Sequence, residues 1–277
     1  MDNETCIQKF VAAYTHRLSD FTLYIYPKAI RSLLEFSQKA FHEVTSRDIR
    51  QWIQESQRKY KPNSVNVRIG AIRMFYRFCS EDALIKQDPT ASINYIAIPE
   101  SPTYYLQMDQ LTQLRKVVEH DLQKRALIEV LYATGMRLSE ALAMKLEDIN
   151  WTDRFIHIPN GKRKKARIVC FTNTCATFLQ EYLNARESDL PYVFLNSSRT
   201  GPAIKRTINY QFDRYSEQLG FRVTPHVLRH TFAAHLAKKG MPLNGIQTLL
   251  GHEFPHQTQV YARLYADARK EIYDQWM

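Results

Sequence analysis

Apolar residues recur every three or four positions in three stretches of the first 95 residues. They are, in chain order, Ile30, Leu33 and Leu34; Ile49, Trp52 and Ile53; and Val65, Ile69, Ile72, Phe75, Tyr76 and Cys79. This spacing places side chains on one face of a helix. Thr45 and Pro62 stand where the second and third helices would begin. The pattern predicts a small all-helical bundle over residues 1–95.

Prolines interrupt the helical pattern after residue 95. The stretch 96–103 contains Pro99 and Pro102, and a turn-like Asp88-Pro89 precedes it. Proline lacks a backbone N–H and disfavours helix at itself and at the residue before it. We therefore predict a linker over 96–103 and a second domain over 104–277.

The second domain mixes helical and strand patterns. Helical spacing covers 106–120 and 123–133, and Gly135 ends this run before a helix with Arg137 in its first turn. The β-rich runs 154–158 and 167–171 flank a basic turn, which predicts a hairpin.

Two more helices are predicted toward the C-terminus. Thr224 and Pro225 are suited to start one that ends near Gly240, and another follows over 242–250. The expected fold is mainly α, with an N-terminal helical bundle and a mixed α+β second domain that holds a small β-sheet.

Composition fits this layout. The 277 residues exceed one domain of roughly 100–200 residues. With 38 Lys and Arg against 28 Asp and Glu, the formal charge of +10 suits a nucleic acid partner, although an ordinary soluble basic protein fits as well. The N-terminus does not resemble a signal peptide and no apolar run approaches roughly 18 residues, so we expect a cytoplasmic protein without a membrane partner. The four cysteines lack C-x-x-C spacing, and we interpret them as structural or incidental thiols.

Three segments carry chemistry. Arg137 lies in one, His226 and Arg229 in the next, and His252 stands nine residues before Tyr261 in the last. A phenol can attack phosphorus, two guanidiniums can hold the charge of a phosphate, and imidazoles can donate hydrogen bonds or move protons. Such a set can run a phosphoryl transfer without a metal.

Histidine spacing also raises a metal site as an alternative. His226 and His230 are four residues apart, and His235, His252 and His256 follow. The H-E-x-x-H arrangement is absent, and no carboxylate or thiol cluster completes a ligand set, so we predict no metal. We interpret His230, His235 and His256 as packing or surface residues.

In this order and spacing, the three segments resemble the active site of the tyrosine recombinase (integrase) family. Arg137, His226, Arg229, His252 and Tyr261 fall on the five best-marked positions of that family. The resemblance covers essentially the whole chain and is most specific over 103–277. It implies a site-specific recombinase that cleaves and rejoins double-stranded DNA without a cofactor, ATP or a metal.

The resemblance implies a role for each residue. Tyr261 would attack a scissile phosphate, which forms a 3′-phosphotyrosine and releases a 5′-hydroxyl. Arg137 and Arg229 would hold the non-bridging oxygens, His226 would assist proton removal, and His252 would hydrogen-bond the phosphate. Tyr265, one helical turn on, is the rival nucleophile.

A lysine of the hairpin would protonate the departing 5′-oxygen. Lys162 fits best because it directly follows Gly161, with Lys164 and Lys165 as competitors and as candidate DNA contacts. Glu140, three residues after Arg137, matches an acidic residue that supports the site in many members.

DNA binding and assembly are further implications of the resemblance. The N-terminal domain would clamp DNA, with Arg68, Arg73 and Arg77 as candidate contacts, although a solvated helix face has the same pattern. The C-terminal tail, residues 262–277, carries an apolar stripe made of Leu264, Ala268, Ile272 and Trp276. The tail would be donated to a neighbouring subunit in a homotetramer on two DNA sites, or it would pack within its own subunit. Accessory DNA-bending proteins or a partner recombinase are compatible with such an assembly.

Two interpretations from other classes remain. A DNA-binding regulator on the same scaffold would lack the tyrosine or an arginine, and neither is missing. A type IB topoisomerase would use the same residues to relax a single duplex. The sequence leaves open whether recombination serves integration, excision, or resolution of DNA dimers or cointegrates.

Overall fold

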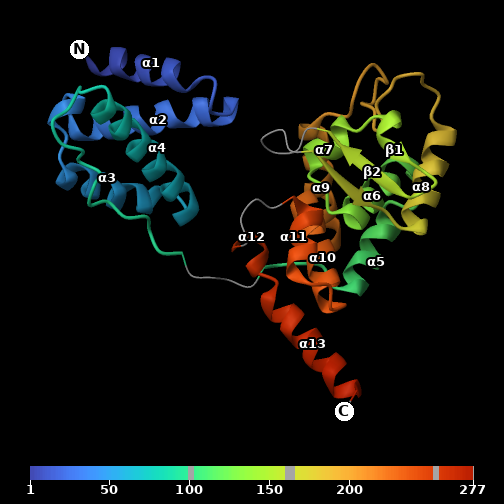
Figure 1. Ribbon diagram of the computed structural model, residues 1–277. Coiled ribbons are helices and arrows are strands. Elements are labelled where there is room, and N and C mark those ends of the chain that lie inside the picture. The colour runs from blue at the N-terminus through green and yellow to red at the C-terminus, as the bar shows by residue number, and fades with distance from the viewer. Residues whose placement is uncertain (99–102, 160–165, 252–255, 277) are drawn as a thin grey trace. The chain divides into compact units, whose positions relative to one another are not determined.

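The computed structural model describes residues 1–98, 103–159, 166–251 and 256–276 (Figure 1). The chain divides into two compact units, Met1–Glu100 and Ser101–Met277. No helix in the described ranges is both long enough and apolar enough to cross a membrane.

The first unit is a helical bundle. Its elements are α1 (Asn3–Tyr14), α2 (Asp20–Ser37), a 3₁₀ turn η1 (Phe41–Glu43), α3 (Ser46–Lys59) and α4 (Pro62–Glu81). Thr45 caps α3 by accepting a hydrogen bond from the Asp48 N–H, and Pro62 is the first residue of α4. The apolar residues that predicted the helices, including Trp52 and Phe75, are buried together. The prediction of a helical bundle is confirmed.

The second unit combines helices with a small sheet (Figure 1). Its elements are α5 (Met108–Val117), α6 (Leu122–Thr134), α7 (Leu138–Ala143), a 3₁₀ turn η2 (Leu146–Asp148), β1 (Ile149–Asn150), β2 (Phe155–Ile158), β3 (Arg167–Cys170), α8 (Asn173–Ala185), α9 (Lys205–Leu219), α10 (Pro225–Lys238), α11 (Leu243–Leu250), α12 (His256–Gln259) and α13 (Ala262–Trp276).

The three strands form an antiparallel sheet in the order β1-β2-β3. The predicted hairpin is confirmed, with Ile156 opposite Val169 and both side chains in the core. Strand β1 was not predicted, because two residues are too short to show an alternating pattern. The chain is thus mainly helical with one small sheet, as the sequence predicted.

Helix α6 forms the centre of the second unit and packs against α8 and α10. Its residues 126–131 are all buried, including Glu129, whose two carboxylate oxygens accept hydrogen bonds of 2.6 and 2.8 Å from Arg115. A buried charge needs such a partner, since an unpaired one would be strongly destabilising. The helix is therefore fixed in rotation as well as in position.

Gly135 ends α6 in the left-handed conformation, with φ +61°. A Cβ placed there would lie 2.3 Å from the Phe232 ring, so only glycine fits. The chain then turns at once into α7, which begins at Leu138. Arg137 is therefore the residue that precedes the helix, not a member of its first turn as predicted. The difference is within the usual uncertainty of helix ends.

We expect Gly135→Ala to lower the free energy of unfolding by roughly 2–4 kcal/mol, because positive φ and overpacking against Phe232 both oppose a side chain there. Chemical unfolding in urea measures the loss. The control is Gly220→Ala, since Gly220 has φ +70° and its Cβ would meet no atom within 4 Å. That variant should lose only about 1–2 kcal/mol. Equal losses would contradict the role of the Phe232 contact.

Candidate active site

Arg229 is the fifth residue of α10 and is only 5% exposed. Its Nη1 donates to the Gly135 carbonyl and its Nη2 to the Leu250 carbonyl, each at 2.6 Å. Burial, with help from Arg137 and Arg167, lowers the pKa of Arg229 to about 9, so the guanidinium keeps its charge at neutral pH. Two of its five N–H groups are engaged with these carbonyls, and the others remain for a ligand.

Glu140 joins two further arginines. Arg167 donates from Nη1 and Nη2 to the two carboxylate oxygens at 2.9 and 2.7 Å, and Arg137 donates from Nη1 at 2.7 Å and from its backbone N–H at 2.7 Å. Burial would raise the pKa of Glu140, but the hydrogen bonds from Arg167 and Arg137 outweigh it and lower the pKa to about 2. The carboxylate is therefore charged at neutral pH.

The three arginines also meet the end of α11. The last carbonyls of this helix accept one arginine each: Leu249 from Arg167 Nε at 3.1 Å, Leu250 from Arg229, and Gly251 from Arg137 Nη2 at 3.3 Å. Carbonyls at a helix C-terminus lack intrahelical partners and carry partial negative charge, so cations stabilise them. The arginines thus fix where α11 ends and the segment toward Tyr261 begins.

Three guanidiniums and one carboxylate leave this cluster with a net positive charge. Arg137 is its most accessible member, with 28% of its side chain exposed, whereas Arg167 is 10% exposed. Guanidinium groups present paired donors that match the oxygens of a phosphate. The cluster is suited to hold an anion at Arg137 and Arg229.

A second group of side chains links α10 to Tyr261. His226 and His230 lie one helical turn apart, and their Nε2 atoms are 2.9 Å apart. The Nδ1 of His230 is hydrogen-bonded to the Tyr261 hydroxyl. Tyr261 is 1% exposed and packs among Phe232, Leu250 and their neighbours. The tyrosine and both histidines therefore form one connected line.

Burial dominates the electrostatics of this line. It lowers the pKa of His226, with help from Arg229 and Arg222, and lowers the pKa of His230 to about 4. Burial also raises the pKa of Tyr261, and the charge of Arg229 opposes that effect. Both imidazoles and the phenol are consequently neutral near pH 7.

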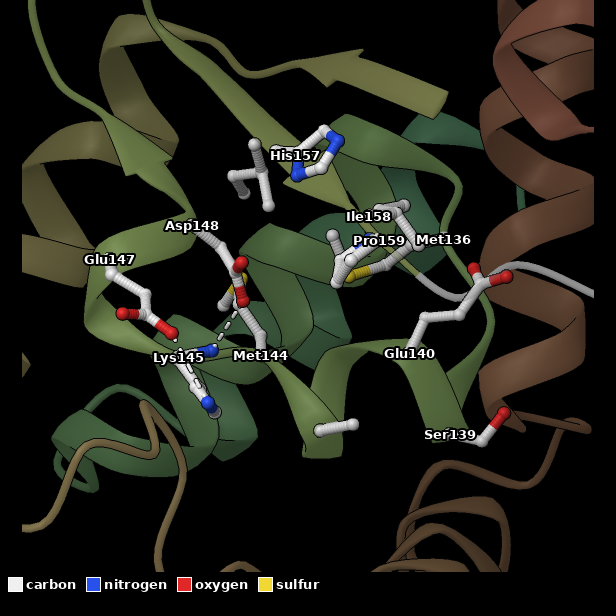
Figure 2. A pocket seen from close by; sticks show the side chains of 12 residues that line it. Met136, Ser139, Glu140, Met144, Lys145, Glu147, Asp148, His157, Ile158 and Pro159 are labelled. Atoms are coloured by element: carbon white, nitrogen blue, oxygen red, sulfur yellow. Dashed lines mark hydrogen bonds and ion pairs between the residues drawn. The ribbon is translucent and has the colours of Figure 1, made fainter. Parts of the chain in front are cut away.

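A cavity of about 310 Å³ opens beside Glu140, between α7, η2 and β2 (Figure 2). Its lining includes three carboxylates, those of Glu140, Glu147 and Asp148, and one ammonium, that of Lys145. Figure 2 shows Lys145 bound to its acidic neighbours on one side and Glu140 on the other. Because the cavity lacks surplus positive charge, the arginine cluster is the better anion site.

Similarity to known proteins agrees with this geometry. The model of the phage integrase family matches residues 104–267, and that of the phage integrase N-terminal SAM-like domain matches 7–85. The chain belongs to the phage integrase family of tyrosine recombinases. It is accordingly a site-specific DNA recombinase.

Two relatives and one solved structure illustrate the match. Tyrosine recombinase XerC of Chlamydia trachomatis is 33% identical over 87% of this chain and 80% of its own length. Tyrosine recombinase XerA of Pyrococcus furiosus is 31% identical over 87% of this chain and 85% of its own length. The Tn1549 transposon integrase in complex with transposon right end DNA shares the fold, with a TM-score of 0.81 over 100% of this chain and 99% of that one, at 17% identity.

Five of the predicted site residues of the recombinase lie in the described part of the second unit. They come from the start of α7, from α10 and from the α12–α13 turn. Arg137, Glu140 and Arg229 are connected through the end of α11, and His226 and Tyr261 are connected through His230. The other predicted site residues of the second unit lie outside the described residues; they are Lys162, Lys164, Lys165 and His252.

Two residues of the site were missed in the sequence. Arg167 was predicted only as the first residue of a strand. The sequence does not show whether an arginine side chain is buried or lies on the surface. His230 was interpreted as a packing or surface residue, yet its ring lies between His226 and the Tyr261 hydroxyl. Its position four residues after His226 was the available signal. His235 is a packing residue, held by Tyr132 and the Leu106 carbonyl. The side chain of His256 lies outside the described set.

Among the described residues, no three His, Cys, Asp or Glu side chains are grouped so that they could hold a metal ion. The Tyr265 ring lies against Arg269, and no described hydrogen bond joins its hydroxyl to the histidines.

The arginines of α4 differ in their surroundings. Arg68 donates to Ser32 at 2.8 Å and stacks on Trp52 and Tyr60. Arg73 donates to the Ile93 carbonyl at 2.7 Å. Arg77 is exposed. Arg68 and Arg73 therefore serve the packing of their own unit, and Arg77 is the arginine of this set best placed for an external phosphate.

We expect Glu140→Gln to lower the free energy of unfolding by about 3 kcal/mol at pH 7, because it leaves buried arginines without their counter-charge. The pKa of Glu140 is depressed from 4.5 to about 2. The stabilisation is therefore fully present above pH 4.5 and is lost as the pH falls toward 2. Urea unfolding of both proteins between pH 3 and 7 measures this difference.

Glu147→Gln is the matched control, because Glu147 is an exposed carboxylate of the same cavity. It should change stability little at any pH. If the loss of unfolding free energy caused by Glu140→Gln is the same at pH 3 as at pH 7, the stabilisation does not come from the ionised Glu140 carboxylate.

Proposed function

We propose that Tyr261 is the nucleophile of strand cleavage and that Arg137 and Arg229 bind the scissile phosphate. The observation that supports this most is the hydrogen-bonded line from Tyr261 to α10, the helix that also carries Arg229. The phenol and the positive cluster thus belong to one site. Attack by the Tyr261 oxygen forms a 3′-phosphotyrosine and displaces the 5′-oxygen, which keeps the phosphodiester energy for rejoining.

The arginines would act on the charge of the transition state. Each has N–H groups left after its contacts with protein carbonyls or Glu140, and these would donate to the non-bridging oxygens. Glu140 and Arg167 would hold Arg137 in place. His226 would assist removal of the tyrosine proton, His252 would hydrogen-bond the phosphate, and Lys162 would protonate the 5′-oxygen.

Double-stranded DNA is the proposed substrate. The first unit would also bind this DNA, with Arg77 contacting a phosphate of its backbone. We propose that four subunits act on two DNA sites in the cytoplasm, in integration, excision, or resolution of dimers or cointegrates. Accessory DNA-bending proteins or a partner recombinase would complete such assemblies. Relaxation of one duplex, the type IB topoisomerase alternative, would need no pairing of sites.

Tyr261→Phe should abolish the covalent protein–DNA adduct on a nicked substrate that traps cleavage, and should retain DNA binding in a gel shift. The phenol oxygen alone forms the bond to phosphorus. Tyr265→Phe is the control and should keep the adduct. The wild-type adduct should form in excess EDTA, because guanidiniums stabilise the charge in place of metal ions. An adduct mapped to Tyr265 would overturn the assignment.

The tail has an inner and an outer part. Helix α13 packs against α10, Leu264 lies against the cluster around Tyr261, and Ala268 is buried. The inner half of the predicted stripe is therefore intramolecular. The side chains of Ile272 and Trp276 lie outside the described residues, and the proposed donation to a neighbour is restricted to this outer part.

Deletion from Arg269 onward should leave single-site binding within about twofold and should reduce two-site recombination by tenfold or more, since it removes the outer stripe and spares Leu264 and Ala268. Gel shift and a two-site recombination assay measure the two effects. The matched control is Glu271→Gln, because Glu271 is an exposed residue of the same segment. This variant should recombine like the wild-type protein. Full recombination by the truncated protein would refute a role for the outer tail between subunits.

A further inference from the structure

The hydrogen-bonded line of Tyr261, His230 and His226 has a definite direction. Both imidazoles are neutral near pH 7, and a neutral imidazole carries one N–H and one acceptor nitrogen. Two arrangements are then possible: either the phenol donates to His230 Nδ1, or His230 donates to the phenol.

Burial of the phenol selects between them. Among the hydrogen bonds of the described residues, His230 is the partner of the Tyr261 hydroxyl. If His230 donated, the phenol proton would be buried without an acceptor, at a cost of roughly 1–3 kcal/mol. The Tyr261 O–H therefore donates to His230 Nδ1, and His230 Nε2–H donates to His226 Nε2. The remaining N–H of His226 is at Nδ1. Of the three residues His226 is the most exposed to solvent, although its ring is covered enough for burial to lower its pKa.

We propose that His230 is the catalytic base that takes the proton of Tyr261 and passes it to solvent through His226. This inference rests on the proposed role of Tyr261 as the nucleophile. It assigns chemistry to a residue that sequence analysis left to packing.

The proton transfers balance. The Tyr261 O–H bond breaks as His230 Nδ1–H forms, His230 Nε2–H breaks as His226 Nε2–H forms, and His226 releases its Nδ1 proton to water. The phenolate forms the bond to phosphorus as the bond to the 5′-oxygen breaks, and that oxygen takes a proton from the proposed general acid, Lys162, to become the 5′-hydroxyl. Rejoining runs the same steps in reverse and returns the proton to the tyrosine oxygen.

Burial and charge both act on the groups of this line. Burial lowers the pKa of both histidines and raises that of Tyr261, whereas Arg229 adds to the lowering at both histidines and opposes the rise at Tyr261; Arg222 also lowers the pKa of both histidines. Arg137 adds to the effect at His226. A positive field stabilises the phenolate and destabilises an imidazolium, so neither histidine keeps the proton at neutral pH. His226, at the exposed end, is the exit.

Single-turnover cleavage of the nicked substrate by full-length protein tests the relay between pH 5.5 and 9. A neutral base with a depressed pKa works across this range, so the wild-type rate should change less than about threefold. Ionisation of the phenol directly into solvent would instead raise the rate about tenfold for each pH unit. A wild-type rate with that slope overturns the proposal without any variant.

His230→Asn is the decisive variant, because the amide oxygen accepts the phenol hydrogen bond but does not take its proton. It should cleave about 10²-fold more slowly at pH 7, and the defect should shrink as the pH rises. A defect of the same size at every pH, or none, means that His230 only positions Tyr261. His235→Asn, a change of a packing histidine on the same helix, is the matched control and should keep the wild-type pH profile.

A joining assay separates proton transfer from damage to the phosphate site. A DNA strand ending in a 3′-(p-nitrophenyl phosphate) has a leaving group that departs as an anion and needs no proton. On this substrate, Tyr261→Phe and the double variant Tyr261→Phe/His230→Asn should join a 5′-hydroxyl strand at equal rates. A slower double variant refutes the relay. Absence of any Tyr261 adduct from the wild-type protein would instead remove the nucleophile assignment itself.

Discussion

The attachment of three arginines to the end of α11 is the interaction on which the site depends. Arg137, Arg167 and Arg229 come from three different elements, yet each donates to one of the three successive carbonyls from Leu249 to Gly251. Those carbonyls have no partners in the helix and would otherwise need water. Cationic donors satisfy them and bring the guanidiniums together despite their mutual repulsion.

Glu140 makes that arrangement tolerable. Its two oxygens accept four hydrogen bonds from Arg137 and Arg167, which offsets part of the charge and orients both groups. Gly251 allows the close approach, because a Cβ there would lie 3.0 Å from Arg167 Cδ. The cluster keeps a net positive charge. Arg137 and Arg229 have N–H groups beyond those in the described hydrogen bonds, and these are the donors proposed to bind a phosphate.

Tyr261, the proposed nucleophile, is held by different forces from those that hold the arginines. Its side chain is packed among apolar side chains of α10 and α11, and the one described hydrogen bond of its hydroxyl is with His230. An almost completely covered phenol meets a DNA phosphate only after the covering side chains move. Packing therefore encloses a neutral tyrosine, while the charged cluster is already assembled.

Local physics explains what the sequence by itself determined. Helical spacing, the caps at Thr45 and Thr224, the breaks at Gly135 and Gly251 and the β-rich runs of β2 and β3 each depend on a few neighbouring residues, so the mainly helical fold and the β2–β3 pair were predictable. The family resemblance added which histidines, arginines and tyrosine to examine. Those residues are recognisable from their order alone.

Only the tertiary structure decided which side chains meet. Arg167 is 82 residues from the carbonyl it binds, and His230 is 31 residues from Tyr261. Arg68 and Arg73 resembled a DNA-binding face but are engaged in contacts of their own unit. The burial of a side chain, its charged partners and the tautomer of a histidine depend on such long-range packing, so the spacing of residues along the chain does not predict them.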